Sequence, residues 1–367
     1  MTSICKMRRK KLLNAAADLN LDYILLTDPT SIYYYCGVKY VTYERFCGML
    51  LQISTENATL IVPALDAGRL QDSDIKQITF QDGEDALLIV GNLLGGKKKL
   101  GIEKGNLRLV TADALLAGAG LSLDDLTDIS SLITKERLIK DSAEIELFRE
   151  ACRITDQMLS DWRTIVKPGV RESDLRMELV RQMIMADDVT VDLDFICATG
   201  PNTVSAHAFA SPRIVAPGDP IMVDFGAIYK HYYADETRTF FFGQPSDKMK
   251  EIYQIVLEAN LAGISKVKPG RPIGEVDKAA RAVIEKAGYG EFFTHRTGHG
   301  IGLDIHESPS VSSDNEQLME PGMVFTVEPG IYLPEWGGVR IEDDVVVTES
   351  GCEILTHYPK ELDKVII

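Results

Sequence analysis

The sequence predicts a two-domain protein of mixed α and β structure, whose second domain is built from two related halves. The chain of 367 residues is long enough for two cores of ordinary size. Its first part alternates short apolar runs with helical patterns, which is typical of an α/β domain. Its second part repeats two short motifs in the same order, which indicates a duplicated unit.

Apolar runs with the length of strands predict the first domain. These runs are DYILLT, GMLLQI, ATLIVP and KLGIE, at residues 22–27, 48–53, 58–63 and 99–103. The TEN segment at 55–57 is typical of a hairpin turn between the second and third runs. Asp141, followed by Glu144, then gives the signature of a helix start. We place the domain boundary near 135, which gives domains 1–135 and 136–367.

The second domain repeats itself loosely. VKPG occurs at 166–169 and again at 267–270, each time between two helical stretches. PGDPIMVDFG at 217–226 and PGMVFTVEPG at 321–330 share the pattern PGxxxxV(D/E)xG, at an offset of 104 residues (217 to 321). The alternative explanation of this match is that two unrelated strands each follow a Pro-Gly turn. Two matches in the same order favour a duplicated unit of two helices followed by a β-hairpin.

Each predicted hairpin carries two acids. Asp224 is followed by Asp235 after a turn near Lys230, and Glu328 is followed by Glu342. Paired strands would place such acids side by side, with Cβ atoms about 5 Å apart. Any one of them could face solvent, but four carboxylates buried together could not all stay ionised without cations. Two divalent ions would balance the four charges.

The segment GHGIGLDIHE at 298–307 holds two of the six histidines, His299 and His306. A dinucleotide-binding loop is a poor alternative, because no buried strand precedes the glycines and Pro309 follows where a helix should run. An HExxH zinc site also fails, because the text is HESPS. A histidine among carboxylates suits paired Mn, Co, Fe or Zn ions.

Asp224, Asp235, His299, Glu328 and Glu342 follow one another in the order D-D-H-E-E. Their contexts are VDFGA, ADETRT, GHGIGLDIHE, VEPGIY and GGVRIEDD. This pattern resembles the pita-bread metallopeptidase family, specifically its Xaa-Pro aminopeptidase and prolidase branch, over essentially the whole chain. The resemblance implies a creatinase-like α/β N-terminal domain and a pseudo-twofold catalytic domain. It also implies two divalent metal ions, with Mn first and Co, Fe or Zn as alternatives.

The resemblance implies a role for each ligand. Asp224 would bind one ion through both oxygens, and His299 would bind the other. Asp235 and Glu342 would bridge the two ions. Glu328 would complete the shell of the second ion and carry the proton from water to the leaving nitrogen.

Further site residues come from the same resemblance. His207 and His306 would line the pocket and contact the scissile carbonyl or the proline side of the substrate. Arg340 would brace the site by pairing with a ligand carboxylate, and Thr237 would stand behind the ligands. The substrate would be a peptide with proline at its second position, and the assembly a homodimer.

One departure affects substrate choice. The dipeptidases that the chain resembles carry an arginine directly after the proline of the HExP turn, where this chain has Ser310. We therefore expect a Xaa-Pro aminopeptidase that acts on longer peptides, with a prolidase acting on dipeptides as the alternative. A methionine aminopeptidase, a creatinase-like hydrolase of C–N bonds in small molecules and a non-catalytic scaffold are further alternatives.

Net charge, apolar segments and cysteine usage limit the partners and the cellular compartment that we expect. The formal charge of −16 argues against nucleic acid and anionic membranes, because both demand basic patches. No apolar segment approaches the roughly 20 residues of a membrane span. The six cysteines are scattered without a CxxC pair, which is typical of a reducing compartment. We therefore expect a cytoplasmic protein.

Overall fold

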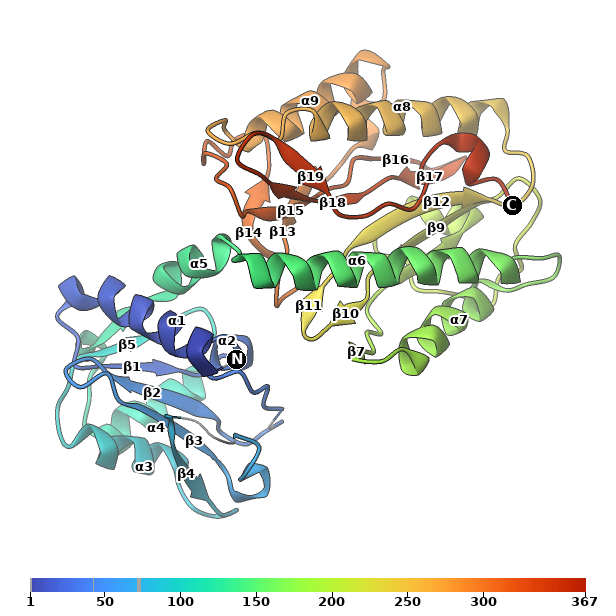
Figure 1. Ribbon diagram of the computed structural model, residues 1–367. Coiled ribbons are helices and arrows are strands. Elements are labelled where there is room, and N and C mark those ends of the chain that lie inside the picture. The colour runs from blue at the N-terminus through green and yellow to red at the C-terminus, as the bar shows by residue number, and fades with distance from the viewer. Residues whose placement is uncertain (1, 42, 71–73) are drawn as a thin grey trace. The chain divides into compact units, whose positions relative to one another are not determined.

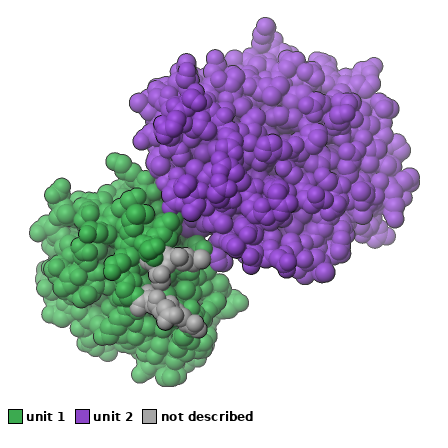
Figure 2. Space-filling view, viewed as in Figure 1, with its two compact units in different colours: residues 1–137 green, residues 138–367 purple. Residues whose placement is uncertain are grey.

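The computed structural model describes residues 2–41, 43–70 and 74–367 (Figure 1). The chain divides into two compact units, Met1–Arg137 and Leu138–Ile367, which Figure 2 draws in different colours. Within the described ranges, no helix is both long enough and apolar enough to cross a lipid bilayer.

The first unit contains a six-stranded mixed sheet in the order β4-β3-β2-β1-β5-β6. Its strands are β1 Tyr23–Leu26, β2 Gly48–Gln52, β3 Ala58–Pro63, β4 Lys76–Phe80, β5 Leu100–Ile102 and β6 Leu126–Asp128. The four predicted strands are confirmed as β1, β2, β3 and β5. The predicted hairpin is confirmed as well, because β2 and β3 pair antiparallel on either side of 55–57.

Helices lie on both faces of this sheet (Figure 1). They are α1 Thr2–Ala15, α2 Pro29–Cys36, α3 Ala86–Leu94, α4 Leu109–Ala119 and α5 Ser130–Leu138. Val90 of α3 and Leu115 of α4 pack against Leu25 and Ile61 of the sheet, and all four side chains are buried. Helix α1 packs on α2 on the other side of the sheet.

The second unit consists of two halves with the same build, as the sequence repeat predicts. Each half has two helices and an outer pair of strands that encloses an inner hairpin, with further short strands beside them. The helices are α6 Ser142–Trp162, α7 Glu172–Met185, α8 Asp247–Ile264 and α9 Gly274–Lys286. The predicted helix start is confirmed, because Asp141 caps α6 and forms a reciprocal capping box with Glu144.

The outer pair and the inner hairpin follow the same order along the chain in both halves. Those of the first half are β7 Val189–Thr190, β8 Ile196–Thr199, β9 Pro220–Phe225, β10 Ile228–Tyr229, β11 Tyr232–Tyr233 and β12 Glu236–Phe241. Those of the second half are β13 Gly298–Gly300, β14 Glu307–Val311, β15 Val324–Val327, β16 Gly330–Leu333, β17 Gly337–Arg340, β18 Asp343–Val347 and β19 Cys352–Ile354. The outer pairs are β9–β12 and β15–β18, and the inner hairpins are β10–β11 and β16–β17.

Helices α6 and α7 lie on one side of these strands, and α8 and α9 lie on the other (Figure 1). One apolar cluster joins the four helices to strands of both halves, and its fully buried members include Trp162, Phe240 and Phe241. The fold class is therefore the predicted one, an α/β domain followed by a pita-bread domain with internal pseudo-twofold symmetry.

Candidate metal centre

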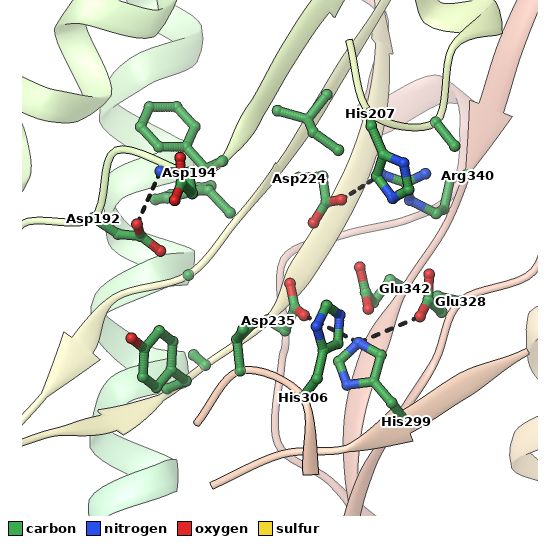
Figure 3. A pocket seen from close by; sticks show the side chains of 18 of the residues that line it. Asp192, Asp194, His207, Asp224, Asp235, His299, His306, Glu328, Arg340 and Glu342 are labelled. Carbon is green, nitrogen blue, oxygen red and sulfur yellow. Dashed lines mark hydrogen bonds and ion pairs between the residues drawn. The ribbon is translucent and has the colours of Figure 1, made fainter. Parts of the chain in front are cut away.

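A cavity of about 520 Å³ lies within the second unit, where the strand ends of its two halves meet (Figure 3). The five predicted ligands and three further predicted site residues line it: His207, Asp224, Asp235, His299, His306, Glu328, Arg340 and Glu342. The backbone register of the two hairpins explains how these residues come together.

In the first half, Lys230 and His231 form a two-residue turn, and both have positive φ angles. This turn fixes a register in which Asp224 pairs with Thr237. Asp235 precedes β12 by one residue and so lies on the diagonal from Asp224, on the same face. The prediction that the two acids are direct cross-strand neighbours is therefore wrong in register, although both side chains reach the same cavity.

In the second half, the turn between Leu333 and Gly337 has three residues, and the register differs accordingly. Val327 pairs with Asp343, so continuing the ladder by one residue places Glu328 opposite Glu342. The predicted side-by-side arrangement holds for this pair.

His299 lies in β13 between two glycines, and the crowding of the backbone explains them. A Cβ on Gly298 would stand 2.0 Å from the carbonyl oxygen of Thr326, and a Cβ on Gly300 would stand 2.0 Å from that of Ser308. The strand therefore fits between its neighbours only without side chains on either side of His299. This close fit aims the imidazole at the acids: its Nε2 is 3.6 Å from Asp235 Oδ2 and 3.5 Å from Glu328 Oε1.

Asp235, His299 and Glu342 form the tightest group. Each offers one ligand atom, and these atoms lie within 4.8 Å of one another. The three residues are 8%, 4% and 1% exposed. Two carboxylates and one imidazole form an oxygen-rich set that fits a divalent ion of the first transition row.

The electrostatics of the cavity also favour a cation. Burial raises the pKa of Asp235 and Glu342 well above the usual range, and the neighbouring carboxylates add to the effect. Burial likewise raises the pKa of Glu328 to about 7. Burial lowers the pKa of His299 to about 4, which keeps its ring neutral, as a metal ligand must be. Divalent ions would relieve the repulsion among the acids.

Arg340 and Thr237 hold the carboxylates from behind. The Arg340 guanidinium forms an ion pair with Asp224 and donates to the Thr237 hydroxyl at 3.1 Å. Thr237 in turn donates its hydroxyl to Glu342 at 2.5 Å. Arg340 thus connects Asp224 of the first half to Glu342 of the second through one hydroxyl.

The two predicted pocket histidines occupy different places. The ring of His306 stands edge-on to that of His299, with their centres 4.3 Å apart. His207 lies on the loop that follows the 3-10 turn Gly200–Val204, and it is exposed. Both side chains line the cavity (Figure 3).

Three residues of the site were not singled out from the sequence. Tyr332 accepts a hydrogen bond from Arg340 at 2.8 Å and bonds to Nε2 of His295 at 2.9 Å. Asp344 is buried and accepts the backbone N–H of Asp235 at 2.9 Å. Arg296 lines the cavity. Alternation along the second hairpin could have indicated Tyr332, whereas the position of Arg296 depends on contacts between strands.

Comparisons with known proteins cover both units. The model of metallopeptidase family M24 matches residues 146–349, and that of the creatinase/prolidase N-terminal domain matches residues 8–139. A Xaa-Pro dipeptidase of Pyrococcus furiosus is 34% identical over 358 residues, which cover 97% of this chain and 99% of that protein.

Solved structures agree. A Xaa-Pro dipeptidase from Bacillus anthracis has 35% identity and a TM-score of 0.89, with 99% of this chain and 100% of that one covered. An X-Pro aminopeptidase from Thermotoga maritima has 32% identity and a TM-score of 0.86, with 98% and 99% covered. These matches extend over nearly the full length, and the buried Asp, His and Glu group fits a metal ion. The chain therefore belongs to metallopeptidase family M24, in the group of Xaa-Pro peptidases with a creatinase/prolidase N-terminal domain.

Proposed function

We propose that this protein is a prolidase, a metal-dependent Xaa-Pro dipeptidase that hydrolyses the bond before proline in dipeptides. Relatives named Xaa-Pro dipeptidase match the chain from end to end. The expectation of an aminopeptidase depended on Ser310, and the surroundings of Ser310 now support the alternative.

Arg296 is the observation that carries the proposal. Arg296 lines the cavity, and its Nη1 lies 3.4 Å from Oγ of Ser310. Ser310 pairs directly with His299 across β13 and β14. A cation therefore stands beside the position where the dipeptidases that the chain resembles carry their arginine. Within the ranges that the structure describes, Arg296 forms no ion pair, so its planar donors can bind the carboxylate of a dipeptide.

The proposed ligands are Asp224, Asp235, His299, Glu328 and Glu342. Two divalent ions, with Mn²⁺ first and Co²⁺, Fe²⁺ or Zn²⁺ as alternatives, would supply the Lewis acidity that activates a water molecule and polarises the scissile carbonyl. The five side chains fit such a pair because they are oxygen-rich, buried or half-buried around one cavity, and left with excess negative charge.

Residues of the cavity also bind the substrate, orient a ligand carboxylate and transfer a proton. His207 and His306 line the cavity and would contact the scissile carbonyl or the proline ring. Arg340 holds the Asp224 carboxylate in one orientation. Glu328 is the group to which we assign the proton transfer, because Arg340 already occupies Asp224, and Glu342 already accepts from Thr237. The proline nitrogen has no N–H in the peptide bond, so it must gain this proton to leave as an amine.

The test compares Ala-Pro, its amide Ala-Pro-NH₂ and Ala-Pro-Ala with the Mn²⁺-loaded protein. We expect Ala-Pro to be cleaved fastest. Arg296→Met should raise KM for Ala-Pro on the order of 10- to 100-fold, as expected for the loss of a charged hydrogen bond. Arg296→Met should leave cleavage of the amide nearly unchanged, and Arg296→Lys should lie between the two.

The other outcomes are equally informative. Faster release of Ala from the tripeptide would identify an Xaa-Pro aminopeptidase with an open end at Ser310. If Arg296→Met raises KM equally for Ala-Pro and for its amide, Arg296 does not bind the substrate carboxylate. If none of the three peptides is cleaved by the Mn²⁺-loaded protein or by protein loaded with Co²⁺, Fe²⁺ or Zn²⁺, the Xaa-Pro assignment itself fails.

A further inference from the structure

Glu172 is a buried acid that the metal site does not use. It is the first residue of α7, its side chain is fully buried, and it lies far in sequence from every proposed ligand. An acid at the start of a helix is ordinarily a solvated capping residue. The atoms around Glu172 give it a different role.

The Glu172 carboxylate accepts hydrogen bonds from both ends of one loop. Oε1 accepts the backbone N–H of Thr199 at 2.5 Å, and Oε2 accepts that of Ser211 at 2.6 Å. The side-chain amide of Asn202 donates to both oxygens, at 3.2 and 3.0 Å. It also donates to the Ser211 hydroxyl at 3.2 Å. The loop between Thr199 and Ser211 is therefore closed on a single carboxylate.

This loop carries His207. It begins at the end of β8, passes through the 3-10 turn Gly200–Val204, and ends where Ser211 accepts the backbone N–H of Ser173 at 3.0 Å. A second tie comes from Thr203, whose hydroxyl accepts the N–H of Gly338 in β17 at 2.7 Å. No backbone hydrogen bond of residues 206–210 is found within the described ranges, so the place of His207 depends on these ties at the loop ends.

The second half contains an equivalent arrangement. Asp277 of α9 is 1% exposed and accepts the backbone N–H of Thr297 at 3.0 Å and its hydroxyl at 2.6 Å. Thr297 stands two residues before His299. In each half, a buried acid on the second helix thus holds the segment that carries a histidine of the cavity.

We infer that Glu172 is a positioning residue for catalysis, which sets His207 in the cavity by closing the 199–211 loop, and that Asp277 does the same for His299. The inference deepens the proposed function and rests on it only in taking His207 as a group that contacts substrate. Closure of the loop by Glu172 does not depend on the proposed function, and hydrogen exchange measures it directly.

The first measurement is hydrogen exchange of the 199–211 backbone in the Mn²⁺-loaded protein, followed by mass spectrometry. Glu172→Gln keeps the shape of the side chain but turns one acceptor into a donor that faces an N–H. We expect faster exchange across 199–211 in this variant. Glu178→Gln on the same helix is the matched control, because Glu178 pairs at the surface with Arg181 and should leave the loop unchanged.

The second measurement is a double-mutant cycle with His207→Ala, using kcat/KM for Ala-Pro. A misplaced catalytic group costs on the order of 10- to 100-fold in rate, and we expect a loss in that range for Glu172→Gln. In the His207→Ala background the same substitution should cause little further loss, because the group that it positions is gone. Mn²⁺ affinity should stay at the wild-type value. Asp277→Asn should instead weaken Mn²⁺ binding, because it acts on His299.

Unchanged hydrogen exchange of 199–211 in Glu172→Gln would contradict the proposal that Glu172 closes this loop. Losses that multiply in the cycle would overturn the positioning of His207, even if the loop does loosen. Should Glu172→Gln fail to fold, Asn202→Ala serves in its place. It removes the side-chain amide that donates to Glu172 but leaves the two backbone N–H donors to the carboxylate, and the same two measurements apply. If the wild-type protein cleaves no Xaa-Pro peptide, the proposed function fails, while hydrogen exchange still decides the closure.

Discussion

The hydroxyl of Thr237 donates a hydrogen bond to the Glu342 carboxylate at 2.5 Å, across the line where the two halves of the catalytic unit meet. The backbone repeats the link, because the N–H of Glu342 donates to the carbonyl of Thr237 at 3.1 Å. A strand of the first half therefore orients an acid of the second.

Thr237→Val tests this link. Valine has nearly the same shape but no hydroxyl, so Glu342 loses its donor while the packing stays. Groups that orient metal ligands typically contribute 10- to 100-fold to metal affinity, and we expect a loss in that range. Competition with a chelator measures it. Thr237→Ser keeps the hydroxyl and should bind Mn²⁺ nearly as the wild type does; equal loss in both variants would contradict the hydrogen-bond explanation.

Glu342→Gln separates stability from function. Burial and neighbouring acids raise the pKa of Glu342, so its charge destabilises the metal-free fold, and the neutral variant should unfold at a higher temperature than the wild type in EDTA. With Mn²⁺ at 100 times its Kd, the wild type should gain about 2.7 kcal/mol, and the variant should gain far less and lose activity. The surface variant Glu349→Gln is the control. Full activity in Glu342→Gln would refute the assignment of the ligand.

The metal-free protein should become less stable as pH rises from 6.5 to about 8.5. Burial raises the pKa of Glu328 to about 7 and that of Asp344 to about 8, both above their unfolded values. Such groups stabilise the fold while protonated, and this contribution is lost as pH passes through the folded pKa. Burial lowers the pKa of His299 to about 4, and its opposing effect is largely confined to pH below 6.5.

Thermal unfolding in EDTA across this range measures the effect. Saturating Mn²⁺ should reverse the slope, because ligands must lose their protons to bind an ion. A metal-free protein whose stability rises toward pH 8.5 would contradict the buried-acid account.

Gly298→Ala should displace His299. The new Cβ would stand 2.0 Å from a backbone oxygen of β15, so β13 must move away from it. We expect a loss of about 1–3 kcal/mol in unfolding free energy, as for other overpacked sites, together with weaker Mn²⁺ binding. Urea denaturation and chelator competition measure the two effects. Gly351→Ala, where no atom lies within 4 Å of the added Cβ, should change neither.

Much of this arrangement can be predicted from the sequence, because the repeat and the spacing of acids are local patterns. The four strands of the first unit, the helix start at Asp141 and the duplicated build of the second unit all follow from such patterns. The relation between Asp224 and Asp235 does not. It depends on whether the turn at Lys230 has two residues or three, and this one-residue difference changes the partner of every residue in the pair of strands.

Contacts between distant segments could not be predicted from the sequence. Ser310 indicated a missing cation, and only the pairing of β13 with β14 brings Arg296 to it. Glu172 has the sequence signature of an exposed helix start, and its burial depends on a loop that begins 27 residues later.

The division of the proposed ligands between two halves has a consequence for synthesis of the chain. The tightest group takes Asp235 from one half and His299 and Glu342 from the other. An emerging polypeptide therefore cannot assemble this group before Glu342 has been translated and the halves have docked. Capture of an ion by this group would therefore be a late event that reports a correctly assembled catalytic unit, and a chain that stalls or misfolds earlier would have no centre with which to cut peptides.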